Sequence, residues 1–316
     1  MKQLAPYLVV LCGILRSTDL YFRNPMIKNL SIFTLITWEH LINLTVVFPI
    51  ILWNLKQFLR FSLKDFFLFI MVGCGASAMG ILCFTEAFLY INPALAVLLQ
   101  KLQPIMTIAF GALLLREKVD RRFIFWALIA IVSSYFVSFG LTFPFAGEGM
   151  KIAKGAFFAI MAAFFWGGGT IWGKMLLARY DQLFVMSNRF LFGSLFTLIL
   201  AHSFGQGLQM DLIFNKSQPL IYSISYMAVI SGFLATTFFY CGLRWVNASL
   251  ASILELFFPV SSVIIMWISF NRPITMPQLI AGIVMFFSVY KINTLKKIND
   301  LMEAKTETEV ATKTVD

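Results

Sequence analysis

The chain has 316 residues, of which 59% are hydrophobic and 13% charged, and its formal net charge is +10. With a mean hydropathy of +0.83 it carries too little polar surface for a soluble domain of this length, so an integral membrane protein is predicted. Ten hydrophobic runs are long enough to cross a hydrocarbon core of about 30 Å, which takes roughly 20 helical residues. In chain order they cover residues 4–22, 32–53, 66–89, 94–115, 122–143, 153–173, 184–204, 219–242, 248–270 and 277–294.

The two ends of the chain differ from the spans. The first 15 residues look like a signal peptide, but no small-x-small cleavage site follows them, so we expect them to remain as the start of the first span. After about residue 295 the chain is polar and alternates in charge, which leaves too little apolar surface for folding. Residues 295–316 are therefore predicted to form a disordered cytoplasmic tail.

Lysine and arginine are divided unequally between the loops on the two sides of the predicted spans. The side that includes both ends of the chain holds most of them. Positively charged loops stay in the cytoplasm, so both termini are predicted to be cytoplasmic, in a multi-pass protein of the plasma (bacterial inner) membrane. This bias accounts for the net charge, and the expected partner of the basic residues is the lipid bilayer rather than nucleic acid.

One segment of the chain occurs twice. Residues 90–104 recur as residues 245–259, and both copies keep Asn, Leu, Ala, Leu and Pro at the same relative positions. The chain is thus predicted to contain two five-span units, residues 1–145 and 146–294. Because five is odd, the second unit enters the membrane the opposite way up. The predicted fold is an all-α integral membrane protein with ten transmembrane helices in two inverted five-helix repeats.

The repeat places a proline near the middle of the fourth and ninth spans. Pro104 and Pro259 lie about ten residues into these spans, which is close to the bilayer midplane. A proline cannot bond the carbonyl four residues earlier, and the residues there are Gln100 and Glu255. Either neighbouring helices repair an ordinary kink, or the freed carbonyls and long polar side chains line a substrate site. Their coincidence in both repeats favours the second interpretation.

These features together resemble the EamA-like family of the drug/metabolite transporter superfamily. The resemblance covers about residues 5–294 and includes the ten-helix plan, the duplicated unit, the Pro-containing span that leads into Leu113-Leu-Leu-Arg-Glu117, and Ala281-Gly282 in the last span. It implies a cavity lined by the first four spans and by the sixth to ninth, with the fifth and tenth at the periphery. It also implies export or exchange of small polar metabolites.

The chain departs from the family pattern at three places. An acid is common after the ninth span, a lysine at the end of the first, and an arginine in the second. This sequence has Arg272, Asn24 and Glu39-His40 there.

Nine ionisable residues lie within the spans or at their ends. They are Arg16, Asp19, Arg23, Glu39, His40, Glu86, Lys101, Arg189 and Glu255. A charge at the centre of a membrane helix costs about 2.5–3.5 kcal/mol, so these groups are expected to face the interior and pair. They either line a wet cavity or form buried ion pairs that fix the helix register. The second interpretation is strongest for Arg23 and Lys101, which are expected to extend toward the outer interface.

Polar residues at helical spacing on three spans predict a substrate site between the repeats. The predicted binding residues are Arg16, Asp19, Glu39, Glu86, Gln100, Gln103, Trp166, Arg189 and Glu255. Both charge signs suit a zwitterion or a ligand with separate charged and polar ends, such as an amino acid or a nucleoside-like metabolite. Arg16 or Arg189 would hold a carboxylate and Glu255 or Glu86 an amine, while Trp166 would stack on a flat ligand.

Two residues have alternative assignments. Glu86 aligns with Cys241 in the second repeat, so it is unique to the first and is a candidate for a proton-coupling carboxylate. His40 is either a hydrogen-bonded packing residue or a proton relay. Only His40 and His202 are present, and no Cys/His cluster has ligand spacing, so no metal or other cofactor is expected.

Small residues recur at every fourth position of the sixth span, at Gly155, Ala159, Ala163 and Gly167. The pattern predicts close helix packing, with a hinge or a backbone surface for ligand as the alternative.

The sequence lacks hydrolase and phosphate-binding motifs. We therefore expect a secondary transporter, an exporter or exchanger that works by alternating access, rather than an enzyme. A non-transporting scaffold or lipid-handling protein is the alternative function. The expected partner is a small-molecule metabolite, with a coupling proton and a homodimer left open.

Overall fold

The computed structural model describes residues 2–58, 61–117, 119–141, 149–205, 207–214, 220–270 and 274–313. Within these ranges all regular structure is helical, and ten stretches are long and apolar enough to cross a membrane. They are Lys2–Met26, Ile32–Trp53, Leu63–Ala87, Leu95–Leu114, Arg121–Phe139, Gly149–Leu177, Gln182–Ser203, Leu220–Leu243, Ala248–Ile265 and Met276–Leu295. The predicted all-helical fold with ten spans is therefore confirmed.

Half of the spans consist of a single α-helix. These are α3 (Ile32–Trp53), α9 (Arg121–Phe139), α10 (Gly149–Leu177), α11 (Gln182–Ser203) and α17 (Met276–Lys313). A short helix, η1 (Lys2–Leu4), begins the first span, and two others, α4 (Leu55–Phe58) and α12 (Met210–Ile213), lie in the links.

The fourth and ninth spans break at equivalent places. In the fourth, α7 (Pro93–Gln100) ends before α8 (Gln103–Leu114), and in the ninth, α15 (Ala248–Leu254) ends before α16 (Phe257–Phe270). The two prolines therefore fall in the first turn of the second segment, where a missing N–H is tolerated. The first span is also divided, into α1 (Ala5–Ser17) and α2 (Asp19–Met26). Discontinuous spans place free backbone groups and helix ends inside the membrane.

The third and eighth spans each contain a π-helical segment in the middle. In the third, η2 (Met71–Met79) lies between α5 (Leu63–Ile70) and α6 (Gly80–Ala87). In the eighth, η3 (Met227–Leu234) lies between α13 (Leu220–Tyr226) and α14 (Ala235–Leu243). π-helices are rare and are frequently found at functional sites. Their occurrence at matched places is a second sign of the internal repeat.

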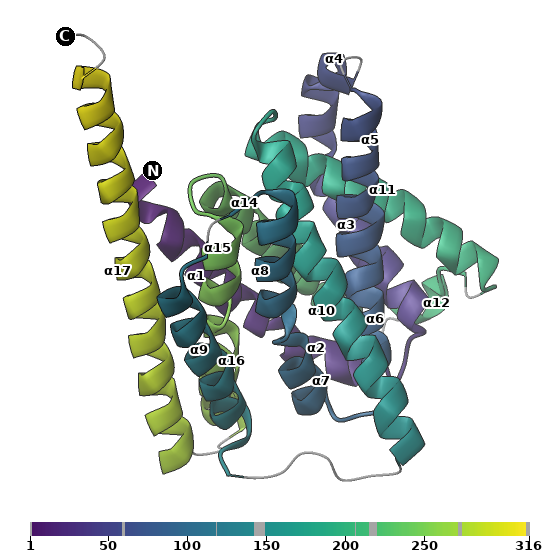
Figure 1. Cartoon of the computed structure of the whole chain (residues 1–316). Coiled ribbons are helices and arrows are strands. Elements are labelled where there is room, and N and C mark those ends of the chain that lie inside the picture. The colour runs from purple at the N-terminus through teal and green to yellow at the C-terminus, as the bar shows by residue number, and fades with distance from the viewer. Residues whose placement is uncertain are drawn as a thin grey trace.

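The two repeats interleave instead of forming separate lobes. Helix α1 contacts α14 and α16 of the second repeat, and α10 contacts α6 and α8 of the first. Helix α3 packs against α11, while α9 and α17 lie side by side at the edge of the bundle (Figure 1). Through these contacts, the middle parts of the broken and π-helical spans come together at the centre of the bundle.

Glycines of α10 allow this close approach. A Cβ atom added at Gly155 would lie 2.7 Å from Ile91, and one at Gly167 would lie 2.8 Å from Met106. The predicted close packing of the small residues in the sixth span is confirmed at these two positions.

Helix α17 continues through Lys313, well past the end of its apolar stretch. This differs from the disordered tail expected over residues 295–316, of which residues 314–316 lie outside the described part of the chain. The segment 301–313 is rich in Ala, Glu, Lys and Met, which are good helix formers. It extends a helix that is already nucleated, so the costly first turn need not be formed again.

Candidate functional site

A cavity of about 140 Å³ lies between the repeats, at the level of the helix breaks and the π-helical segments. Residues of both repeats line it, including side chains from α1, α3, α8, α11 and η3. None of the described lining residues belongs to α9 or α17, which matches the peripheral place that the family resemblance implies for the fifth and tenth spans.

Eight of the nine predicted binding residues line this cavity. They are Arg16, Asp19, Glu39, Gln100, Gln103, Trp166, Arg189 and Glu255. Glu86 is the exception, and its Oε1 accepts a hydrogen bond from the Tyr90 hydroxyl at 3.3 Å. Phe84 lines the cavity, and two residues along an α-helix turn by about 200°, so Glu86 points to another side of α6. An amine-binding or proton-coupling role for Glu86 within this cavity loses its geometric basis.

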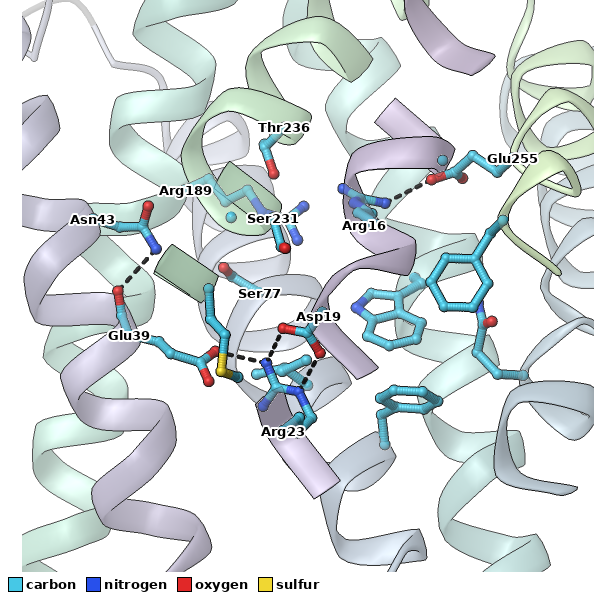
Figure 2. A pocket seen from close by; sticks show the side chains of 18 of the residues that line it. Arg16, Asp19, Arg23, Glu39, Asn43, Ser77, Arg189, Ser231, Thr236 and Glu255 are labelled. Atoms are coloured by element: carbon cyan, nitrogen blue, oxygen red, sulfur yellow. Dashed lines mark hydrogen bonds and ion pairs between the residues drawn. The ribbon is translucent and has the colours of Figure 1, made fainter. Parts of the chain in front are cut away.

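One chain of polar contacts joins the first span to the fourth and ninth spans. Arg16 Nη1 donates to Glu255 Oε1 at 2.6 Å (Figure 2). The other carboxylate oxygen of Glu255 accepts from Gln103 Nε2 at 3.0 Å. Gln100 Nε2 in turn donates to Gln103 Oε1 at 2.6 Å. Arg16 and Glu255 therefore satisfy each other in this conformation, and a ligand carboxylate or amine would have to displace one of them.

A second ion cluster is centred on Arg23. Its guanidinium binds both carboxylate oxygens of Asp19, at 2.5 and 2.9 Å, and Glu39 Oε2 at 2.9 Å (Figure 2). Arg23 also donates to Thr85 Oγ1 at 3.2 Å and is only 1% exposed. The expectation that Arg23 extends to the outer interface is therefore wrong. Two carboxylates inside the protein pair with the buried charge and offset part of the cost of removing it from water.

Lys101 also differs from its predicted position. As a residue of a continuous helix it was expected to point about 100° away from Gln100 and toward the interface. Helix α7 instead ends at Gln100, and Lys101 lines the cavity with 5% exposure. Its ammonium lies 4.2 Å from the centre of the Phe258 ring. Across the described chain, no carboxylate is within ion-pair distance of Lys101.

Arg189 of α11 is held by weak contacts. Its Nη1 lies 3.4 Å from the Tyr240 hydroxyl and its Nη2 lies 3.3 Å from the Ala76 carbonyl in η2. Its Nε has no hydrogen-bond partner among the described residues, although the side chain is buried. Arg189 is therefore a cavity cation with donors to spare.

The cavity also contains a histidine and a group of aromatic rings. Both ring nitrogens of His40 are satisfied, by the Ile36 carbonyl at 2.9 Å and Ser77 Oγ at 3.1 Å, which supports its assignment as a packing residue. Trp166 lies against Gly80, where an added Cβ would be 2.5 Å from the indole nitrogen, and its ring centre is 5.3 Å from that of Phe84.

Several lining residues were missed by the sequence analysis. They are Lys101, Asn43, Ser77, Ser231 and Thr236. Asn43 is one helical turn from Glu39, and that spacing is a signal that was available in the sequence. The π-helical segments, which carry Ser77 and Ser231, have no comparable local signal.

The fourth and ninth spans contact each other on the side of the membrane where α1 begins and α17 ends, here called the terminal side. There α8 packs against α15, and the Glu117 carboxylate accepts from Ala248 N at 2.8 Å, Ser249 N at 3.2 Å and Ser249 Oγ at 2.6 Å. This carboxylate satisfies free N–H groups at the start of α15 and matches the positive end of its dipole.

Lys174 of α10 adds a second contact on the terminal side. Its Nζ donates to the carbonyls of Leu243, the last residue of α14, at 2.6 Å, and of Arg244 at 3.2 Å and Val246 at 2.7 Å, which follow that helix. The ammonium of Lys174 thus lies at the C-terminus of α14, where a positive charge is favoured.

Comparison with known proteins gives matches over most of the chain. A model of the EamA-like transporter family matches residues 4–139 and 153–294. The riboflavin transporter ImpX of Fusobacterium nucleatum is 29% identical over 77% of this chain and 81% of its own length. The uncharacterized inner membrane transporter YicL of Salmonella typhimurium is 28% identical over 64% of each chain.

The fold also has a counterpart among solved structures. A crystal structure of another protein is similar with a TM-score of 0.74 and covers 93% of this chain and 98% of that chain. The two sequences are 16% identical, so this similarity supports the fold alone.

Proposed function

Because the chain belongs to the EamA-like transporter family, we propose that it is a secondary transporter that binds a small polar metabolite in the central cavity and works by alternating access. The observation that carries this proposal is the cavity itself. It lies between two inverted repeats, at the breaks of the fourth and ninth spans, and buried charged groups line it. Buried ionisable residues of this kind mark substrate pathways in membrane proteins.

The proposed cargo combines a flat ring with polar groups. Trp166, Phe84 and Phe258 supply ring surfaces, and Gln100 and Gln103 supply amides. One relative is named as a riboflavin transporter, and riboflavin has this combination of features. Pockets for drug-sized ligands have volumes of about 300–1,000 Å³, so a cargo of this size needs the cavity to widen beyond its present 140 Å³.

Transport by this chain would be driven by exchange, an ion gradient or the cargo's own gradient. We propose export or exchange across the bacterial inner membrane, with the terminal side facing the cytoplasm. The candidates for proton coupling are the cavity carboxylates Asp19, Glu39 and Glu255, because Glu86 lies outside the cavity.

Counterflow in proteoliposomes tests this proposal. Vesicles loaded with unlabelled riboflavin are expected to take up labelled riboflavin, and Glu255→Gln is expected to slow this uptake at least about tenfold because the variant weakens the contact with Arg16. Asp181→Asn is the matched control, since this carboxylate forms an exposed ion pair and does not line the cavity. Efflux from loaded vesicles measures export separately. Uptake no faster than in protein-free vesicles, for riboflavin and for a panel of nucleosides and amino acids, would contradict the proposal.

A further inference from the structure

The lining of the cavity is not uniform. We propose that the part formed by Glu39, Asn43 and Arg189, here called the polar subsite, binds a polyhydroxylated segment of the cargo, such as a polyol chain or a ribosyl group. This inference rests on the proposed transport function and specifies which part of the cargo determines selectivity.

The polar subsite holds atoms that lack hydrogen-bond partners. Four buried side-chain atoms are unsatisfied in the described part of the chain, and three of them are Glu39 Oε1, Asn43 Oδ1 and Arg189 Nε, whose residues all line the cavity. These residues are 7%, 3% and 9% exposed. Native proteins satisfy nearly all of their buried polar groups, so a cluster of exceptions in one cavity points to a ligand.

The contacts of each side chain determine what it offers to a ligand. Asn43 Nδ2 donates to the Glu39 carbonyl at 2.8 Å, which leaves Oδ1 as an acceptor. Glu39 uses Oε2 for Arg23 and keeps Oε1 free. Arg189 offers an N–H donor. Figure 2 shows Arg189 together with Ser77, Ser231 and Thr236 on one side of the cavity, and Asn43 and Glu39 beside them.

A backbone feature leaves room for the Asn43 side chain in its present position. Gly232 of η3 faces its side-chain amide, and an added Cβ there would lie 2.8 Å from Asn43 Nδ2. Any larger residue at position 232 would therefore push this amide out of place.

Hydroxyl groups fit this set of atoms better than a single charged group does. Two acceptors and one donor are free, and each hydroxyl both donates and accepts. An ammonium group would leave Arg189 Nε unsatisfied, and a carboxylate would leave Oδ1 and Oε1 unsatisfied and be repelled by Glu39. Three further lining residues, Ser77, Ser231 and Thr236, carry hydroxyl groups. Successive hydroxyls on one chain can satisfy all three free atoms together.

Binding to the purified full-length protein tests the polar subsite. Two pairs of probes differ only in the polyhydroxylated part: riboflavin against lumiflavin, and adenosine against adenine. The hydroxylated member of at least one pair is expected to bind about 10- to 100-fold more tightly, because a site built for hydroxyls rejects an analogue that leaves its polar groups unpaired. Asn43→Leu is expected to reduce this preference to less than about threefold, and Asn43→Asp, which keeps an acceptor, to retain it.

The chain offers a matched control in Asn188. Its Nδ2 also donates to the carbonyl four residues earlier, Phe184, at 2.9 Å, and its Oδ1 is also buried and unsatisfied. Asn188 does not line the cavity, so Asn188→Leu is expected to leave the preference intact. An equal loss in both leucine variants would overturn the inference.

Two further results would overturn the inference: equal affinity within both pairs, or tighter binding of an amino acid than of every hydroxylated probe. Its failure is separable from failure of the proposed function. Counterflow of riboflavin without a preference over lumiflavin would refute the polar subsite and leave transport standing. Hydroxyl-dependent binding without any counterflow or efflux would refute transport and leave the polar subsite standing.

Discussion

The broken fourth and ninth spans are equivalent in the repeat, yet their contacts with each other differ between the two sides of the membrane. On the terminal side α8 packs against α15, and Glu117 caps the start of α15. On the opposite side, within the described residues, α7 and α16 show no comparable packing. Within the described residues, the contact between these two spans is therefore asymmetric and lies on the terminal side.

The sequence offers a chemical reason for this asymmetry. In the repeat, the position equivalent to Glu117 is Arg272, which lies outside the described residues. A carboxylate is favoured at the N-terminus of a helix and a cation is disfavoured there. Arg272 therefore lacks the charge that would let it cap α7 as Glu117 caps α15.

The largest expected effect comes from Glu117→Ala. A reporter chain carries Ser231→Cys in the cavity and alanine in place of its four native cysteines. Loss of the cap is expected to raise labelling of this cysteine by an impermeant maleimide from the terminal side about 10- to 100-fold, since hydrogen bonds to charged groups contribute about 1.5–3 kcal/mol each. Asp120→Asn is the control, because Asp120 forms no side-chain cap on α9. Unchanged labelling would mean that packing of α8 on α15 closes this side without the carboxylate.

A smaller effect on the same side is expected from Lys174→Met. The variant keeps the apolar stem and removes the ammonium that binds three carbonyls at and just after the end of α14. We expect about threefold to tenfold faster labelling from the terminal side and a thermal midpoint roughly 2–4 °C lower. Lys174→Arg is expected to recover most of both, and a midpoint equal to that of the native chain in the methionine variant would contradict the assigned role.

Arg272→Glu tests the charge argument on the opposite side of the membrane. The variant places a carboxylate at the position equivalent to Glu117, whose carboxylate caps α15. A charge at a helix terminus contributes about 0.3–1 kcal/mol. Labelling of the Ser231→Cys reporter from the opposite side is expected to fall roughly twofold to fivefold. Arg272→Gln separates removal of the cation from addition of the acid, and faster labelling in the glutamate variant would refute the charge argument.

The smallest effect is a pH dependence of the terminal side. Burial, together with a hydrogen bond to Asp65, raises the pKa of Tyr180 above its ordinary value. A raised pKa means that this tyrosine stabilises the fold below the pKa of the unfolded chain, and that the contribution disappears as the pH rises through the folded pKa. The thermal midpoint of the native chain is expected to fall more between pH 8 and about pH 11 than that of Tyr180→Phe. Parallel falls in the two proteins would exclude the contribution.

Much of the fold was predictable because its signals are local. Ten apolar runs, a repeated segment and two prolines predicted the spans, the repeats and a local disturbance of the fourth and ninth spans near Gln100 and Glu255, where the structure has helix breaks. The π-helical segments were not predicted, because no residue preference in η2 or η3 separates them from α-helix.

The site was predictable in composition but less so in geometry. Arg16, Arg189 and Glu255 line the cavity as expected. The errors at Lys101 and Glu86 have one cause, since both depend on the rotational phase of a helix after a break or a π-helical segment. That phase is fixed by packing against distant elements and cannot be read from spacing along the chain.

The π-helical segments also constrain how this chain can change. A π turn holds about one residue more than an α turn, so loss of one residue in η2 would convert it to an α-helix without breaking the span. The residues of α6 would then keep their orientation about the helix axis, because the π turn had accommodated the extra residue. Ile81 and Phe84 would stay at the cavity. The third span therefore tolerates a single-codon deletion at this point without losing its ligand-facing surface, whereas the same deletion in a purely α-helical span would rotate that surface by about 100°.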